Sequence, residues 1–227
     1  MNGTLYGVGV GPGNPKLMTY LAVETIETCP VIAVPAEKRD HAMSYKIAQQ
    51  MVKGLDKKEC LNLPIPMTKD KQTLALSYET AAGQIIRRLE NGEDVAYLTL
   101  GDPTIYSTYS YIQRLVKAQG YEARIINGVP SFCAAAAVLG ESLADRSEQI
   151  HILPSSYGIE EGMAYKGTKV LMKAASQLSK VKQILQENDM AAVMVENCGM
   201  EEEHIYFTVE EMPEKASYYA TVLVKEK

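Results

Sequence analysis

Three short segments of this 227-residue chain carry the residues that could hold a ligand. They are GVGVGPGNP (residues 7–15), LTLGDPTIYSTYSYI (98–112) and INGVPSFCAAAA (126–137). In each, an apolar run is followed by a glycine turn and then by a helical pattern. Glycines leave main-chain amides and carbonyls open to a ligand, and Asp102 and Ser131 add a carboxylate and a hydroxyl. This set suits the binding of a small polar molecule.

The first segment does not match the familiar phosphate-binding loops. The dinucleotide fingerprint requires a glycine at its sixth position, where this chain has Pro12 or Asn14, depending on the glycine that starts the count. A Walker loop needs glycine before the lysine and a hydroxyl after it, but Lys16 lies between Pro15 and Leu17. Prolines also lack the amide donors that bind phosphate. These differences weigh against a phosphate site and against a nicotinamide oxidoreductase.

The loops require strands and helices that place them together. Apolar runs at 5–10, 31–35, 94–100 and 121–128 predict strands, and segments at 16–28, 70–91 and 129–140 predict helices. Residues 101–120 predict a loop followed by a helix that ends near Gln119. Strands that alternate with helices indicate an α/β fold with a mostly parallel sheet. Ligands bind at the carboxyl ends of strands in such folds, so the three loops should converge on one sheet edge.

The second half keeps this alternation and then changes. Strands are predicted at 168–174 and 190–197, and two further strands at 203–209 and 217–227 have no helix between them. An antiparallel ending follows. We therefore expect two α/β domains, residues 1–119 and 120–227, with a mostly parallel sheet in the first and a mixed sheet in the second.

Composition limits the classes of function. The formal net charge is −5 and no basic stripe is present, which disfavours nucleic-acid binding. No apolar run is long enough to cross a membrane, and the first residues lack the pattern of a secretory signal, so a cytoplasmic protein is expected. The four cysteines contain no C-x-x-C pair and the three histidines are scattered, so no metal site is predicted.

Together with KVLMKA (169–174) and AAVMVENCGMEEE (191–203), the three loops resemble the tetrapyrrole methylase family, the class III S-adenosylmethionine-dependent methyltransferases. The resemblance covers nearly the whole chain. Tyr-Ser-Thr at 106–108 and SFCAAAA at 131–137 are most similar to the members that methylate C20 of precorrin-2 or cobalt-precorrin-2 in cobalamin biosynthesis. It implies a homodimer, with S-adenosylmethionine bound in a cleft between the two domains of each chain.

The resemblance also implies which positions contact the methyl donor. In the order of the chain these are Pro12, Gly101, Asp102, Ile105, Ser131, Phe132, Met172, Gly199 and Ala220. Related members have Gly-Gly-Asp where this chain has Leu100-Gly101-Asp102, so main-chain donation there need not be identical. From the residues alone, Asp102 could instead cap a helix and Met172 could be an ordinary core residue.

Methyl transfer from a sulfonium is an in-line displacement, and the sequence nominates no catalytic side chain for it. Orientation of two reactants can contribute ~7–11 kcal/mol, so positioning is the enzyme's main task. Candidate substrate-binding residues are Lys38 and Arg39, which suit the carboxylates of a tetrapyrrole, and Tyr106 and Tyr109, which would form a pocket wall on one helix face. A solvated loop is an equal alternative for the two cations.

These observations predict methyl transfer to C20 of cobalt-precorrin-2 (cobalt-factor II), with the cobalt-containing acceptor favoured by overall resemblance only. Metal-free precorrin-2 is the nearest alternative. Other family activities on a different acceptor, and a module that senses the donor or a tetrapyrrole without turnover, also stay open.

Overall fold

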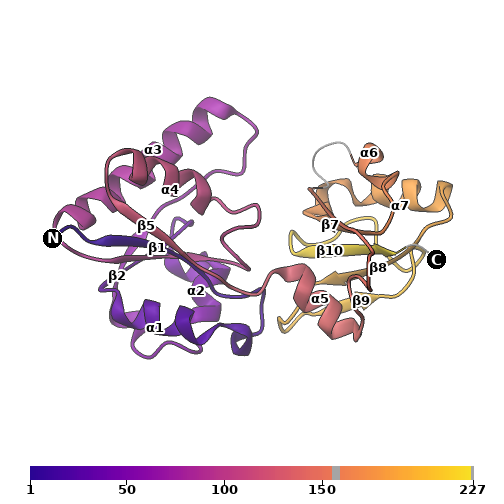
Figure 1. Cartoon of the computed structure of the whole chain (residues 1–227), viewed down its shortest axis with the longest axis horizontal. Coiled ribbons are helices and arrows are strands. Elements are labelled where there is room, and N and C mark those ends of the chain that lie inside the picture. Colours follow the sequence, from indigo (N-terminus) through magenta and orange to yellow (C-terminus); the bar gives the residue numbers. More distant parts are fainter. Residues whose placement is uncertain (155–158, 226–227) are drawn as a thin grey trace. The chain divides into compact units, whose positions relative to one another are not determined.

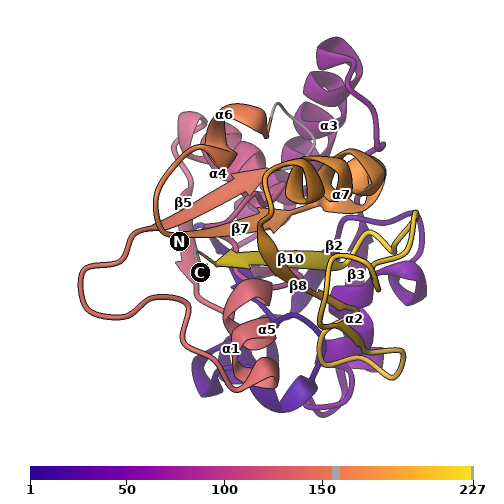
Figure 2. The same ribbon diagram turned by 90° about the vertical axis from the view of Figure 1, so that its right-hand side faces the viewer.

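The computed structural model describes residues 1–154 and 159–225, with Ser176 described by its backbone alone. The chain divides into two compact units, Met1–Pro130 and Ser131–Lys227. Each unit is built on a five-stranded sheet with helices on both faces (Figures 1 and 2). No helix within the described residues is both long enough and apolar enough to cross a membrane.

The sheet of the first unit has the strand order β3-β2-β4-β1-β5, and every neighbouring pair is parallel. Its strands are β1 (Thr4–Gly9), β2 (Val31–Val34), β3 (Glu59–Asn62), β4 (Val95–Thr99) and β5 (Glu122–Ile126). Its helices are α1 (Tyr20–Thr28), α2 (Met43–Ala48), α3 (Lys71–Glu90) and α4 (Tyr109–Ala118). Short 3₁₀ turns lie at Pro15–Leu17, Arg39–His41 and Leu55–Lys57.

Central strand β4 is buried along its whole length, as expected for a parallel strand covered on both faces. Ala96 and Leu98 lie in the core under α1 and α2, whereas Val95 and Tyr97 lie in the core under α3 and α4 (Figure 1). This alternation of side chains brings two separate apolar cores onto one strand.

The second unit has the strand order β6-β7-β10-β8-β9, in which β6 and β7 are parallel and the other pairs antiparallel. Its strands are β6 (Ile150–Pro154), β7 (Thr168–Met172), β8 (Ala191–Glu196), β9 (His204–Tyr206) and β10 (Ala220–Lys225). Its helices are α5 (Ser131–Leu139), α6 (Glu160–Met163) and α7 (Leu178–Glu187), with a 3₁₀ turn at Ala174–Gln177. Helices α6 and α7 lie over one sheet face and α5 over the other (Figures 1 and 2).

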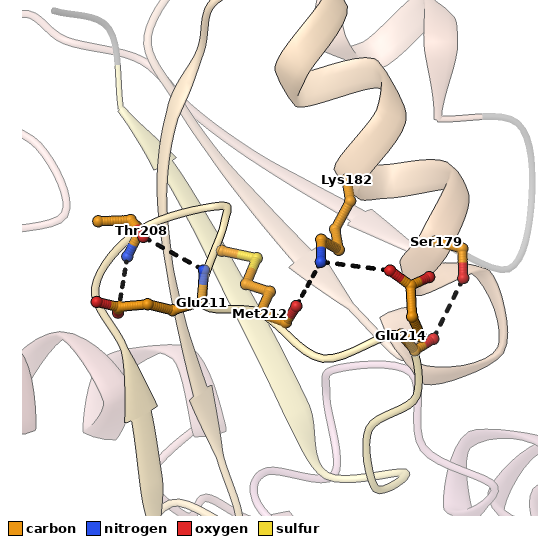
Figure 3. A network of polar contacts seen from close by, with 6 residues as sticks. All are labelled: Ser179, Lys182, Thr208, Glu211, Met212 and Glu214. Carbon is orange, nitrogen blue, oxygen red and sulfur yellow. Dashed lines mark hydrogen bonds and ion pairs between the residues drawn. The ribbon is translucent and has the colours of Figure 1, made fainter.

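The segment between β9 and β10 is fastened to α7 (Figure 3). Lys182 Nζ, on that helix, donates to the carbonyl of Met212 at 2.5 Å and lies 3.5 Å from Glu214 Oε1. Ser179 Oγ donates to the carbonyl of Glu214 at 3.2 Å. Within the segment, the Glu211 amide donates to Thr208 Oγ1 at 3.3 Å. These bonds fix the chain where it enters β10.

The predicted fold class is confirmed, including the mixed second sheet and its antiparallel ending. The domain boundary differs from the expected one after Gln119. Strand β5 pairs with β1 and so belongs to the first sheet, which moves the division of the chain to Pro130.

The helix expected at 16–28 also differs. Asn14 caps only the short turn Pro15–Leu17, because Met18 is extended. Thr19 Oγ1 then accepts the Ala22 amide and starts α1 at Tyr20.

Candidate ligand-binding site

The three sequence-predicted loops of the first unit do meet at one sheet edge. Strands β1, β4 and β5 are parallel, with β1 between the other two, so their carboxyl ends lie side by side. The Gly101 amide donates to the Gly11 carbonyl at 2.8 Å, and the Gly11 amide donates back to Gly101 at 3.3 Å. The Val10 amide donates to the carbonyl of Thr99 at 2.9 Å. The loops after β1 and β4 are therefore joined through their main chains.

Glycines let the loops approach more closely than side chains would allow. A Cβ atom at Gly128 would lie 2.2 Å from the Gly101 carbonyl oxygen and 2.8 Å from the Gly9 carbonyl carbon. A Cβ at Gly9 would lie 2.6 Å from the Gly128 amide nitrogen. Gly101 differs, with a φ of +71°, which favours glycine, and space for a Cβ atom, which would meet nothing nearer than 4.0 Å. Together, Gly9, Gly11, Gly101 and Gly128 form a glycine cluster.

Asp102 ties this cluster together. Its Oδ1 accepts the Thr104 amide at 2.7 Å and the Thr104 hydroxyl at 2.5 Å, and its Oδ2 accepts Asn127 Nδ2 at 3.1 Å and the Gly128 amide at 3.0 Å. Burial raises the pKa of this carboxyl, but the four hydrogen bonds together lower it by more, so the pKa lies below its ordinary value.

The four bonds use the carboxylate's four acceptor positions, which leaves the side chain none for a ligand. Asp102 is also not a helix cap, because α4 begins only after Thr108. It is a positioning residue that joins the loops after β4 and β5. The main chain is what this position leaves open for a ligand.

The other predicted residues of this unit lie close by in sequence but differ in exposure. Pro12 is buried and Ile105 is half-buried, with its amide on the Asp102 carbonyl at 3.3 Å. Tyr106 is 44 % exposed and has a φ of +46°, a strained backbone for a bulky residue. Strain of this kind is found at functional sites.

Tyr109 is a core residue, which corrects its prediction as a substrate contact. It has no exposed surface, and its hydroxyl donates to the Arg124 carbonyl at 2.5 Å. Its ring fills the space that a side chain at Gly7 would need, since a Cβ there would lie 2.3 Å from the ring. Tyr106 precedes α4, so the two tyrosines do not share a helix face as expected.

The predicted cations Lys38 and Arg39 follow β2. The Arg39 guanidinium donates to the Asp56 carbonyl at 3.0 Å and lies 5.4 Å from the centre of the Tyr45 ring. These contacts tie Arg39 to α2 and to the 3₁₀ turn at Leu55–Lys57, which gives it a structural role. Lys38 is exposed.

The predicted residues of the second unit gather at one end of its sheet. Met172, the last residue of β7, is paired in register with Thr221 of β10, next to Ala220. The Thr221 hydroxyl is 3.4 Å from the hydroxyl of Ser131, the first residue of α5. Phe132, which follows, is buried. This arrangement brings the first turn of α5 to the end of β7, so four of the five predicted residues lie together.

Gly199, the fifth, lies in the loop that follows β8 at the same sheet end. Ala220 is paired with Glu196, the last residue of β8, and the Gly199 amide donates to Glu203 Oε2 at 2.6 Å. Glu196 accepts the Ser217 amide at 2.5 Å. Non-glycine residues with positive φ directly follow β7 and β8, namely Lys173 at +58° and Asn197 at +52°. Both strand exits are therefore sharp turns.

Sequence reasoning missed several residues that build these sites. Among them are Gly9, Gly128 and Asn127, which close the contacts between the loops. Their role becomes visible only when β1, β4 and β5 are known to be adjacent. Thr221 lies inside an apolar strand segment, where no sequence pattern marks its hydroxyl as part of a site. The repeated glycines at 7, 9, 11 and 13 were the available signal for close main-chain packing.

The cysteines form no disulfide among the described residues. All four are free thiols, and no group of three His, Cys, Asp or Glu side chains in the described chain could hold a metal ion. Burial raises the pKa of Cys29 to about 12, and of Cys60 and Cys198 to about 11. These three thiols are thus protonated at neutral pH.

Comparisons with known proteins agree with this geometry. Residues 4–213 match the family model of tetrapyrrole (corrin/porphyrin) methylases. The chain is 36 % identical over 202 residues to a probable cobalt-precorrin-2 C(20)-methyltransferase of Methanocaldococcus jannaschii, which covers 88 % of this chain and 85 % of the relative. It is 27 % identical over 237 residues to a precorrin-2 C(20)-methyltransferase of a Sinorhizobium species, covering 98 % and 95 %.

A solved structure has the same fold. The uroporphyrin-III C-methyltransferase of Thermus thermophilus, in complex with S-adenosyl homocysteine, matches with a TM-score of 0.73 at 18 % identity, over 99 % of this chain and 92 % of that one. The family match spans the first unit from β1 onward and the second unit up to residue 213, including the loops after β1, β4, β5, β7 and β8. The chain therefore belongs to the tetrapyrrole (corrin/porphyrin) methylase family.

Proposed function

We propose that this protein is an S-adenosylmethionine-dependent methyltransferase that transfers a methyl group to C20 of cobalt-precorrin-2 (cobalt-factor II) in corrin-ring biosynthesis for cobalamin. The observation that carries the proposal is the 36 % identity, over most of both chains, to a relative with that name. A relative named for precorrin-2 is 27 % identical, and a second relative named for cobalt-precorrin-2, from Salmonella typhimurium, is 25 % identical. Metal-free precorrin-2 is therefore the second candidate acceptor.

The proposed donor contacts follow the loops and strand ends described above. In the first unit they are the main chain of Gly101 and Asp102, with Pro12 and Ile105. In the second unit they are Ser131, Phe132, Met172, Gly199 and Ala220. The room beside Gly101 and the half-buried Ile105 and Met172 suit a donor that has both polar groups and an apolar base. The complex of the Thermus protein with S-adenosyl homocysteine supports the choice of donor.

When bound, S-adenosylmethionine supplies an electrophilic methyl group on a sulfonium, with a neutral leaving group. The task of this chain is to orient donor and acceptor, which can contribute ~7–11 kcal/mol to lowering the barrier. The glycine cluster and Asp102 suit that task, since main-chain contacts hold the loops in one arrangement before a ligand binds. No side chain is assigned as a base.

The acceptor contacts we propose are Tyr106, Lys38 and Arg39. Tyr106 is exposed on the strained loop after β4, and the two cations follow β2 in the same sheet. An acceptor that carries carboxylates needs local cations on a protein whose net charge is −5. The contacts of Arg39 with Asp56 and Tyr45 make Lys38 the more available of the two.

We further propose that the protein acts in the cytoplasm as a homodimer, as the family resemblance implies. Four free thiols fit a reducing compartment. Sedimentation equilibrium of the purified chain tests the dimer, and a mass of one chain, 25.0 kDa, would contradict it.

The test of function is an incubation with isotopically labelled S-adenosylmethionine and either cobalt-loaded or metal-free precorrin-2. Mass spectrometry and NMR then identify the methylated carbon. We expect a single methyl group at C20, with faster turnover of the cobalt-loaded acceptor. A methyl group at another ring position would contradict the assignment, and a preference for the metal-free acceptor would select the second candidate.

A further inference from the structure

Thr99, the last residue of β4, holds a hydroxyl that has no hydrogen-bond partner. The residue is 8 % exposed, and its Oγ1 is one of three buried side-chain oxygens without a partner in the described part of the chain, the others being the hydroxyls of Tyr45 and Tyr97. Most buried hydroxyls in proteins are paired, because an unpaired one loses its bonds to water and gains none. An unpaired hydroxyl at the end of β4 therefore needs an explanation.

The position of Thr99 separates it from the other two. It lies two residues before Gly101, and its carbonyl accepts the amide of Val10, which lies two residues before Pro12. It thus stands between positions proposed to contact the methyl donor. Tyr97 lies two residues further from the sheet edge, and Tyr45 lies on α2.

The neighbours of Thr99 in the sheet do not supply a partner. Side chains alternate along β4, so Thr99 and Tyr97 point to the face covered by α3 and α4, whereas Leu98 points to the other. The neighbour of Thr99 across the β1–β4 pair is Gly9, which has no side chain. On the β1 side, the hydroxyl has only main-chain neighbours.

We propose that Thr99 Oγ1 forms a hydrogen bond with a polar group of the bound methyl donor, and so is a binding residue in addition to the positions that the family resemblance supplies. The inference rests on the proposed function. A hydroxyl can donate or accept, which suits both the ammonium and the ribose hydroxyls of the donor. The negative charge of Asp102, three residues away, favours these groups over the donor's carboxylate.

The test compares the binding of S-adenosyl homocysteine, measured by calorimetry, to the wild type and to three variants. Thr99→Val keeps the shape and removes the hydroxyl, and we expect its affinity to be about 10-fold lower. Thr99→Ser keeps the hydroxyl and should bind like the wild type. Tyr97→Phe removes the unpaired hydroxyl next to it on the same face and should not change the affinity. The midpoint of thermal unfolding without ligand should be unchanged or higher for Thr99→Val.

Equal affinities of Thr99→Val and the wild type would overturn the inference, even if the KM for the tetrapyrrole rose. A lower unfolding midpoint with unchanged affinity would also overturn it, since the hydroxyl would then have a partner inside the free protein, such as a buried water. Failure of the wild type to bind S-adenosyl homocysteine is a different result, and it would contradict the proposed function itself.

Discussion

Replacement of Gly128 by alanine should separate the loops that the glycine cluster holds together. The new Cβ would lie 2.2 Å from the Gly101 carbonyl oxygen, about 1.2 Å short of the 3.4 Å at which ordinary contacts begin. The atoms it meets belong to the main chain of Gly101 and Gly9, which cannot swing aside as a flexible side chain would. The loops after β4 and β5 must therefore move apart.

The cost follows from the contacts that such a shift would break. Overpacking costs about 1–3 kcal/mol. The Gly128 amide would also leave Asp102, and a hydrogen bond to a charged group contributes about 1.5–3 kcal/mol. We expect the free energy of unfolding to fall by about 2.5–6 kcal/mol, a large share of the ~5–15 kcal/mol typical of proteins.

Urea unfolding monitored by far-ultraviolet circular dichroism measures this loss. Hydrogen exchange should then assign the faster exchange to peptides that contain 9–12, 100–104 and 126–129. The matched control is Gly83→Ala on α3, where a new Cβ would meet no atom within 4 Å. Alanine is the better helix former by about 1 kcal/mol, so this variant should be more stable than the wild type.

The two variants make opposite predictions for the same type of substitution. If Gly128→Ala unfolds at the wild-type urea concentration and binds S-adenosyl homocysteine equally well, the close packing of the three loops does not support the site. The glycine cluster would then not be what holds the three loops together.

Three further predictions concern single side chains. Asp102→Asn should lower the free energy of unfolding, measured in urea, by about 2–4 kcal/mol, because the new NH₂ group cannot accept the hydrogen bonds that a carboxylate oxygen accepts. An unchanged urea midpoint would contradict the role of Asp102 in joining the two loops. Hydrogen bonds lower the pKa of Asp102 below 3.8, so the stability that its carboxylate contributes is complete above that pH and is lost as the pH falls through the folded-state pKa. In an acid titration, Asp102→Asn should therefore lose less stability than the wild type below about pH 4. Parallel curves for the two proteins would argue against this role. Lys182→Met should speed hydrogen exchange across 207–219 and lower the free energy of unfolding by about 1–3 kcal/mol, because it leaves the Met212 carbonyl without its donor. The control is Lys180→Met, which removes the exposed ion pair of Lys180 with Glu160. Equal effects of the two substitutions would count against a role of Lys182 in holding the segment between β9 and β10.

Much of the fold could be predicted because local patterns and tertiary packing agree. The buried run at 94–100 and the periodicity of 70–91 correspond to β4 and α3. The domain boundary was placed too early because β5 follows a helix that ends in glycine, as a linker also would. Only its pairing with β1, which depends on residues more than a hundred positions away, assigns it to the first sheet.

The candidate site was predictable in its location and less so in its roles. The convergence of three loops follows from parallel topology, which the alternation of strands and helices indicates. The role of Asp102 could not be deduced, since its partners Asn127 and Gly128 come from another loop. Tyr109 was misassigned because the space left by Gly7, which its ring fills, is not visible in a pattern of tyrosines.

The hydrogen bonds between Gly11 and Gly101 have a consequence for how such an enzyme can change over evolutionary time. They connect backbone to backbone, so the frame of the proposed donor site depends little on the identity of the surrounding side chains. Mutations in the outer parts of these loops can reshape the region that selects an acceptor while the frame itself stays as it is. One scaffold of this kind can therefore acquire new acceptors without having to reinvent how it holds the molecule that gives up its methyl group.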